Sequence, residues 1–241
     1  MFQLKPERFG EDEFSQQTIE VCGMSFIAHR SGALYWPAEK VLIVADLHLE
    51  KGSAGAAHGQ FLPPYDTRAT LLKLADALDH FGAEAVIALG DSLHDRDGAS
   101  RMAAEDLDVL QMIQDEREWI WVKGNHDPHI DRRLGGTVVD DVGLSGLVLR
   151  HAPFPSRITH EIAGHLHPAA RVGLYGMTLR RPCFISNGLR LVLPAFGAFT
   201  GGLNVLDEAF LPVFGNDGFA VWLLGQEGLY PVATRQLCAD R

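Results

Sequence analysis

Short apolar runs separated by polar, glycine-rich stretches organise the first half of the chain. The runs 41–45, 85–89 and 119–122 have the length and apolar content of strands buried on both faces. A helical pattern follows each of the first two runs. Strand, loop and helix repeated in this order predict a parallel sheet flanked by helices.

The first helix has a clear start, stripe and stop in the sequence. Asp66 is a good N-cap residue, and Gly82 stands where the helix should end. The apolar stripe at i, i+3, i+4 and i+7 consists of Leu71, Leu74, Ala75 and Leu78. A second helix is expected at about 100–114. The stretch 50–65 between the first strand and the first helix is rich in glycine and proline, which predicts a long loop.

The remaining segments have a strand-like pattern. Residues 19–35 predict a hairpin-like pair of strands, and the chain after Gly135 predicts largely antiparallel β structure. Its expected strands are 137–140, 146–150, 158–163, 170–173, 177–185, 190–193, 218–223 and 229–232. A glycine-rich stretch, 194–202, and a short helix near 204–210 interrupt them. No linker composition divides the chain, so we expect one domain over residues 1–241.

Polar groups that bind metals follow the predicted strands. The first run ends in Asp46-Leu47-His48, and the next two end in Gly90-Asp91 and Gly124-Asn125-His126-Asp127. His151 and Gly164-His165-Leu166-His167 follow apolar runs in the second half. Residues i and i+2 of an extended chain point to the same side, so Asp46 and His48 are expected to face one point. Ligands of parallel sheets collect at the carboxyl ends of strands, where a metal is the simplest occupant.

Composition narrows the metal chemistry and the partners. Eleven histidines and only three cysteines favour nitrogen and oxygen ligands. The cysteines Cys22, Cys183 and Cys238 are far apart and odd in number, which predicts reduced thiols in a cytoplasmic protein. The formal net charge of −10 argues against a large basic surface for duplex DNA. No apolar run is long enough to cross a membrane.

The order of these motifs resembles the calcineurin-like metallophosphoesterase superfamily, whose pattern is D-x-H, G-D, G-N-H-D/E, H and G-H-x-H. The resemblance extends from Val41 to His167. It implies an α/β (α+β) fold, a four-layer αββα sandwich of two mixed β-sheets flanked by helices. It also implies two divalent metal ions. One ion would be held by Asp46, His48, Asp91 and His167, and the other by Asp91, Asn125, His151 and His165.

The same resemblance suggests catalytic roles. His126 is the candidate to protonate the leaving oxygen. Asp127 either orients His126 or caps a turn that begins at Pro128. The sequence departs from many members of the superfamily after Asp91, because His94 follows two residues after Ser92. His94 therefore either contacts the substrate or packs behind the metal ligands.

A narrower resemblance covers nearly the whole chain. The stretches 45–52, 62–67 and 193–202 are similar to those of the bacterial ligase-associated DNA damage response endonucleases called PdeM. That similarity implies cleavage of DNA phosphodiesters with Mn²⁺, in association with an ATP-dependent DNA ligase and a helicase. The ligand types also suit Fe and Zn, and affinity order alone favours Zn.

Substrate contacts are less well specified by the sequence. Lys51, Arg150 and Arg181 are the candidate substrate-binding cations, and surface ion pairs are the alternative for the arginines. His58, Arg157 and Arg180 are further candidates. The glycines of 194–202 either form a phosphate-binding nest or allow tight packing. Trp119 and Trp121 are predicted to be core residues.

Three functions are compatible with these features. The first is a phosphodiesterase acting on DNA, with a single-stranded or flapped substrate favoured by the acidic chain. The second acts on a small phosphodiester or nucleotide, and the third is a non-catalytic scaffold of the same fold. An edge strand of the second sheet offers a surface for a homodimer.

Overall fold

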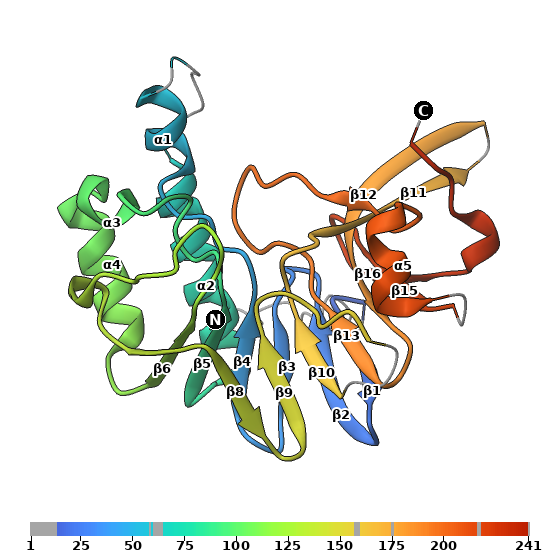
Figure 1. Cartoon of the computed structure of the whole chain (residues 1–241), viewed down its shortest axis with the longest axis horizontal. Helices are drawn as coiled ribbons and strands as arrows, with labels where there is room; N and C mark the ends of the chain where they lie inside the picture. The colour runs from blue at the N-terminus through green and yellow to red at the C-terminus, as the bar shows by residue number, and fades with distance from the viewer. Residues whose placement is uncertain are drawn as a thin grey trace, which may run out of the picture.

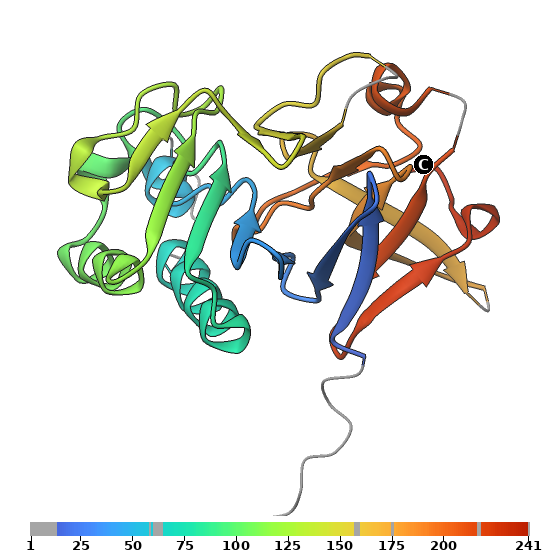
Figure 2. The same ribbon diagram turned by 90° about the horizontal axis from the view of Figure 1, so that it is seen from below.

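The protein, described here by a computed structural model, contains two mixed β-sheets packed against each other (Figures 1 and 2). The structure describes residues 14–57, 59, 65–156, 160–174, 176–215 and 218–240. Strands of the first sheet lie in chain order: β1 (Gln16–Val21), β2 (Met24–His29), β3 (Leu34–Trp36), β4 (Val41–Val44), β5 (Ala85–Leu89), β6 (Glu118–Val122) and β7 (Thr137–Val139). Pairing is antiparallel from β1 to β4 and parallel from β4 to β7.

The second sheet is built from the rest of the chain in the order β14-β11-β12-β13-β10-β9-β8, with β15 added to β12 and β16 to β15. Its strands are β8 (Asp141–Leu144), β9 (Leu147–Arg150), β10 (Glu161–Ala163), β11 (Pro168–Leu174), β12 (Met177–Ser186), β13 (Arg190–Val192), β14 (Leu203–Asn204), β15 (Ala220–Leu224) and β16 (Leu229–Val232). Most of its strand pairs are antiparallel, as predicted. The exceptions are β9 with β10, β10 with β13 and β11 with β14, which are parallel.

The helices lie on the two outer faces. They are α1 (Lys51–Ala57), α2 (Asp66–Phe81), α3 (Gly98–Arg101), α4 (Ala104–Gln114) and α5 (Leu211–Phe214), with 3-10 turns at Arg132–Leu134, Glu208–Phe210 and Thr234–Gln236. Figure 1 shows α2 and α4 on the side of the first sheet and α5 on the side of the second. The outer layer on the second sheet is therefore thin.

Side-chain alternation along the strands produces three apolar layers. Leu42 and Val44 of β4 face α2 and α4, whereas Val41 and Ile43 of the same strand face the second sheet. The opposite face of the second sheet packs against α5, and Cys183 of β12 and Phe214 of α5 both belong to the third apolar cluster. These layers confirm the predicted αββα arrangement, and they explain why the β4 sequence is apolar at every position.

Several elements differ from their predicted form. Residues 16–36 form a three-stranded meander instead of one hairpin. The predicted loop 50–65 contains α1, whose start is fixed by Glu50: the carboxylate accepts hydrogen bonds from Ser53 and Thr67, at 2.6 and 2.9 Å. These tertiary contacts override the low helix propensity of the glycines.

The ends of the helices also differ. Asp66 is the first residue of α2, after Tyr65, and its carboxylate accepts the Gly52 backbone N–H at 3.0 Å instead of capping the helix. Gly82 ends α2 in the left-handed conformation, as predicted. The expected helix 100–114 is divided into α3 and α4, and the one near 204–210 lies at 208–214.

The state of the cysteines and the absence of a membrane-spanning helix among the described residues correspond to two expectations from composition. Cys22, Cys183 and Cys238 are free thiols. Within the described residues, no helix has both the length and the apolar character needed to cross a membrane.

Candidate metal centre

Five chain segments bring polar side chains to one region, beyond the carboxyl ends of the central strands. In the first sheet they follow β4, β5 and β6, and in the second they follow β9 and β10. The parallel pairing of these strands puts their carboxyl ends at one edge of each sheet. The ligand-type side chains from both sheets therefore converge there.

The first group consists of Asp46, His48 and His167, whose ligand atoms all lie within 4.8 Å of one another. The Nε2 atoms of His48 and His167 are 3.3 Å apart, and His167 Nε2 is also 3.3 Å from Asp46 Oδ1. Asp46 Oδ2 accepts the backbone N–H of His165 at 2.9 Å, whereas the buried Oδ1 makes no hydrogen bond of good geometry. A buried carboxylate oxygen without a hydrogen-bond donor, facing two imidazole nitrogens, fits a divalent cation.

The second group contains Asp91, Asn125, His151 and His165. His151 Nε2 lies 2.9 Å from Asn125 Oδ1, 3.4 Å from Asp91 Oδ2 and 3.0 Å from His165 Nδ1. On the other side of its ring, His151 Nδ1 donates a hydrogen bond to the Leu89 carbonyl oxygen at 2.9 Å. This contact fixes the tautomer and leaves the Nε2 lone pair facing the other ligand atoms, as in metal-binding histidines.

Five of the seven candidate ligands have a left-handed backbone, which differs from the extended conformation predicted for Asp46 and His48. β4 ends at Val44, and Asp46 and His48 have φ angles of 54° and 44°. The same region of φ is adopted by Asp91, His165 and His167. Asp46 and His48 still converge, but through two strained residues instead of strand alternation. Left-handed residues other than glycine are uncommon and gather at functional sites.

Two glycines allow the segments to approach closely. A Cβ atom on Gly124 would lie 2.1 Å from the backbone nitrogen of Asp91, and one on Gly164 would lie 2.6 Å from Asp46 Oδ2. Any larger residue at these positions would displace a candidate ligand. The glycines in the G-N-H-D and G-H-x-H motifs therefore have a direct steric role.

Burial favours the neutral form of two of the candidate imidazole ligands, His48 and His165. Burial, reinforced by the neighbouring imidazoles of His167 and His126, lowers the pKa of His48 to about 2. Burial and His151 also lower the pKa of His165. Burial alone would lower the pKa of His167, but the Asp46 carboxylate outweighs it and raises that pKa. Neutral imidazoles are the form that binds metals.

His126 and His94 form the wall next to the first group. His126 Nδ1 donates a hydrogen bond to the His94 carbonyl oxygen at 2.7 Å, and its Nε2 lies 3.9 Å from Asp91 Oδ2. The His94 ring stacks near that of His126 with centroids 5.5 Å apart, and its Nδ1 is 3.5 Å from His48 Nδ1. Burial and the charge of Lys51 lower the pKa of His94.

The fully buried Asp127 has a different role from either of the two predicted. Its carboxylate accepts backbone hydrogen bonds from Asp91, Leu93 and Gly124 at 3.1, 3.0 and 2.9 Å. Burial raises the pKa of Asp127 to about 6, although the backbone N–H groups oppose the shift. The hydrogen-bond partner of the His126 ring is the His94 carbonyl oxygen, and not Asp127. Asp127 instead fixes the turn that carries Asp91.

Comparison with known proteins identifies the family. The family model of the calcineurin-like phosphoesterases matches residues 39–159, which is half of the chain and spans the segments from β4 to just beyond His151. The chain belongs to the calcineurin-like phosphoesterase family. It is a metallophosphoesterase hydrolase, and this family uses two divalent metal ions.

Two solved structures are similar to the chain, and the first of them supports the family assignment. A nuclease called MPE from Pseudomonas putida is 31% identical, with a TM-score of 0.71, over 90% of this chain and 100% of that one. Yfce, a phosphoesterase from E. coli, is 16% identical with a TM-score of 0.41, over 80% of this chain and 98% of that one. A comparison with curated protein sequences gave no match.

The candidate substrate-binding cations of this phosphoesterase have different surroundings. Lys51 Nζ donates a hydrogen bond to the Phe199 carbonyl oxygen at 3.1 Å, across the gap between α1 and the β13–β14 loop. Arg150 is 3.6 Å from an Asp141 carboxylate oxygen and 3.7 Å from one of Glu161, so it belongs to ion pairs, the alternative given for it above. His58 and Arg157 lie outside the described residues.

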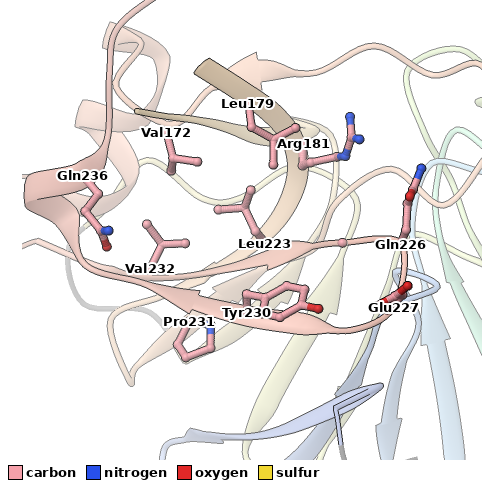
Figure 3. A pocket seen from close by; sticks show the side chains of 11 residues that line it. Val172, Leu179, Arg181, Leu223, Gln226, Glu227, Tyr230, Pro231, Val232 and Gln236 are labelled. Atoms are coloured by element: carbon pink, nitrogen blue, oxygen red, sulfur yellow. The ribbon is translucent and has the colours of Figure 1, made fainter. Parts of the chain in front are cut away.

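Arg181 lines two hollows on the second sheet. One is a cavity of about 540 Å³ on the outer face, with apolar walls that include Leu179, Leu223 and Tyr230 (Figure 3). The other is a small depression that His167 also lines, together with Arg180. Of the three predicted cations, Arg181 therefore shares a surface depression with a candidate metal ligand.

The glycine-rich stretch between β13 and β14 packs tightly instead of forming an open nest. Its backbone N–H groups at Phe196, Gly197 and Ala198 donate to Ala45, Asp46 and Thr70, at 2.8, 3.1 and 2.9 Å. A Cβ atom on Gly197 would lie 2.0 Å from the Leu47 carbonyl oxygen. The stretch thus supports the backbone of the D-x-H motif.

One structural pair near the site was missed by sequence reasoning. Arg190 and Glu161 are both buried, and their side chains form an ion pair at 3.0 Å. Arg190 also donates to the carbonyl oxygens of Phe154 and Ser156, and the Glu161 carboxylate accepts the Phe154 N–H at 3.1 Å. The pair therefore holds the segment that follows His151. An arginine within the apolar run 189–193 was the available signal.

Proposed function

We propose that the protein is a dinuclear-metal phosphodiesterase that cleaves DNA, with single-stranded or flapped DNA as its substrate. The observation that carries this proposal is the pair of adjoining ligand groups, each with a buried carboxylate and two imidazoles. One group contains the buried Asp46 oxygen that no hydrogen-bond donor satisfies. Two such groups side by side suit two cations better than one.

The ligand assignment follows the two groups. In this proposal Asp46, His48 and His167 hold one ion, and Asn125, His151 and His165 hold the other. Asp91 would be shared by both ions, as the family resemblance implies; its Oδ2 lies 3.4 Å from His151 Nε2, and its Oδ1 accepts the His126 backbone N–H at 2.9 Å. When bound, two divalent ions polarise phosphoryl oxygens and lower the pKa of a coordinated water.

His126 is proposed as the general acid. Its Nδ1 proton is committed to the His94 carbonyl, so the proton that a cationic His126 can release is on Nε2. The ring is partly exposed, with 41% of the side chain accessible, so a leaving oxygen can reach it. His94 stands beside it and is proposed to contact the substrate at the same wall.

DNA as the substrate rests on the similarity to the nuclease from Pseudomonas putida and on charge. The chain carries a net charge of −10, which does not favour a broad contact with duplex backbone. A single strand held by the metal ions and a few cations, including Lys51 and Arg181, requires a smaller basic surface. Single-stranded or flapped DNA is therefore a better substrate for this chain than intact duplex.

Metal identity and partners are proposed from resemblance. We infer Mn²⁺, with Fe or Zn as alternatives that the same nitrogen and oxygen ligands accept. Association with an ATP-dependent DNA ligase and a helicase, and a cytoplasmic location, remain predictions from the sequence. The homodimer also remains a prediction. β16 pairs only with β15 among the described strands, and Pro231 removes one N–H donor from it.

The test combines metal analysis with three substrates. Purified protein is loaded with Mn²⁺, Fe²⁺ or Zn²⁺ and assayed on circular single-stranded DNA, on duplex plasmid and on bis(p-nitrophenyl) phosphate. We expect two bound ions per chain and preferential cleavage of the single-stranded circle. Hydrolysis of the small diester without cleavage of any DNA would contradict the nuclease assignment. A protein that binds no divalent ion would contradict the dinuclear mechanism.

A further inference from the structure

Phe199 combines an unfavourable backbone conformation with an exposed aromatic ring. Its φ angle is 59°, and 52% of the residue is accessible to solvent. A bulky side chain in the left-handed region is a conformational outlier, because its Cβ approaches the following carbonyl group. Folding alone does not explain why this position is a phenylalanine. Glycine would adopt this φ without strain, and an exposed ring buries little apolar surface.

The loop around Phe199 is held by contacts that do not involve its ring. Thr200 Oγ1 donates to the Gly197 carbonyl oxygen at 2.8 Å, and the Ala198 N–H donates to Thr70. The Phe199 backbone carbonyl accepts the hydrogen bond from Lys51. The loop therefore presents the ring from a fixed backbone, which limits the entropy lost when something binds to it.

Phe199 lies at the rim of the candidate metal centre. Two residues further along the loop, the Gly201 carbonyl oxygen is 3.2 Å from Nδ1 of His167. Lys51, which contacts Phe199, follows His48 by three residues. Figure 1 shows this loop, in orange, extending from the second sheet toward α1 and α2. The loop that carries the exposed ring is thus hydrogen-bonded on both sides to segments that contain ligands of one proposed metal ion.

We propose that Phe199 is a stacking platform for one nucleobase of the DNA strand whose phosphate occupies the metal centre. Every base has a π face, so an exposed phenyl ring binds a strand without selecting a sequence. The Lys51 ammonium group has three donors, of which the Phe199 carbonyl takes one, and a neighbouring phosphate can take another. This inference rests on the proposed nuclease function. It adds that the ring binds a base of the substrate, next to the phosphate at the metal centre.

Two substitutions separate stacking from support of the fold. Phe199→Gly removes the ring and the backbone strain together, and Phe199→Trp keeps an aromatic surface. Leu211→Ala is the control, because Leu211 is 56% exposed and lies on α5, on the other side of the second sheet from this loop. Each protein is loaded with Mn²⁺ and assayed on a single-stranded oligonucleotide. The inhibition constant of an abasic oligonucleotide of equal length is measured in parallel.

The expected result is specific to the base. For Phe199→Gly we expect KM for the normal oligonucleotide to rise about ten-fold, from the typical loss of one stacked base. The inhibition constant of the abasic strand should be equal for Phe199→Gly and the unmodified protein. Leu211→Ala should keep the original KM, and Phe199→Trp should raise KM much less than Phe199→Gly because it retains a π face. The melting temperature of Phe199→Gly should stay within about 2 °C, because strain relief offsets lost contact.

The alternative outcomes are distinguishable. Cleavage of DNA by all variants with one common KM would overturn the stacking subsite and leave the nuclease function standing. An equal increase in KM for normal strands and in the inhibition constant for abasic strands would show a structural effect and also overturn it. A protein that cleaves no DNA would overturn the proposed function, and the subsite with it.

Discussion

The carboxylate of Asp127 accepts the backbone N–H of Asp91 at 3.1 Å through Oδ1, and that of Leu93 at 3.0 Å through Oδ2. The buried Asp127 side chain, which lies in the turn after β6, therefore holds the backbone of the turn after β5 in place. Since Asp91 is the proposed bridging ligand, its position relative to both ions depends on a residue that contacts neither. This is the kind of outer support that metal sites use to orient their ligands.

We expect Asp127→Asn to weaken metal binding by about ten- to a hundred-fold. Asparagine has one acceptor oxygen, so its NH₂ group would face a backbone N–H donor at Asp91 or Leu93. The metal-free protein should also lose about 1–3 kcal/mol of its free energy of unfolding. Calorimetric titration with Mn²⁺ and thermal unfolding measure the two effects. Asp131→Asn, in an exposed pair with Arg133, is the control. Unchanged Mn²⁺ affinity in Asp127→Asn would contradict this role.

His126 and Asp91 should respond differently to truncation. His126→Ala is expected to retain both metal ions and to lose about 10²- to 10⁴-fold in kcat, which is the usual contribution of a general acid. Asp91→Ala is expected to lose both ions, because the bridge serves both groups. Metal content by elemental analysis and steady-state cleavage of DNA distinguish the two variants. An Asp91→Ala protein with two tightly bound ions would show that the bridge is misassigned.

Sequence reasoning found the site because its residues follow recognisable strands. The apolar runs 41–45 and 85–89 became β4 and β5, and the residues after them are at the same edge because the pairing is parallel. The remaining candidate ligands, His151, His165 and His167, were identified because their order along the chain resembles that of the family motifs. The fold class was predicted for the same reason, since periodicity identifies the strands and the motif order identifies the sheets.

Local conformation could not be predicted in this way. Asp46 and His48 have left-handed backbones, which their residue types disfavour. This conformation is stabilised by tertiary contacts, such as the hydrogen bond from the His48 N–H to the Asp91 carbonyl oxygen. α1 was missed because its stabilising contact comes from Glu50, a buried carboxylate that no periodicity reveals. The role of Asp127 was missed because its partners are backbone groups, which have no sequence signature.

The buried pair of Arg190 and Glu161 is expected to support the segment after His151. Arg190→Met leaves the Glu161 carboxylate buried without its charged partner, and we expect a loss of about 3–5 kcal/mol in the free energy of unfolding. Glu161→Gln combined with Arg190→Met should recover part of that loss, because the uncompensated charge is gone. Denaturant unfolding of the single and double variants measures the coupling. Strictly additive losses would show that the two residues act independently.

Lys73 on α2 provides a pH dependence of stability that is independent of the metal centre. Its ammonium group lies 3.9 Å from the centre of the Phe196 ring and donates a hydrogen bond to the Phe196 carbonyl. Burial lowers its pKa to about 8, below the ordinary lysine value of 10.5. Between these values the unfolded chain binds more protons than the folded one, so the free energy of unfolding should rise as pH increases.

The rise should amount to about 1–2 kcal/mol between pH 8 and pH 10.5, because the ring and the carbonyl favour the charged form and offset part of the shift. Lys73→Met should abolish it. Lys40→Met is the matched control: Lys40 is exposed and paired with Glu84, and its pKa is raised by that pair, so the rise should persist. Urea unfolding of the metal-free proteins across this pH range measures the difference. A rise of equal size in Lys73→Met would assign the pH dependence to another group.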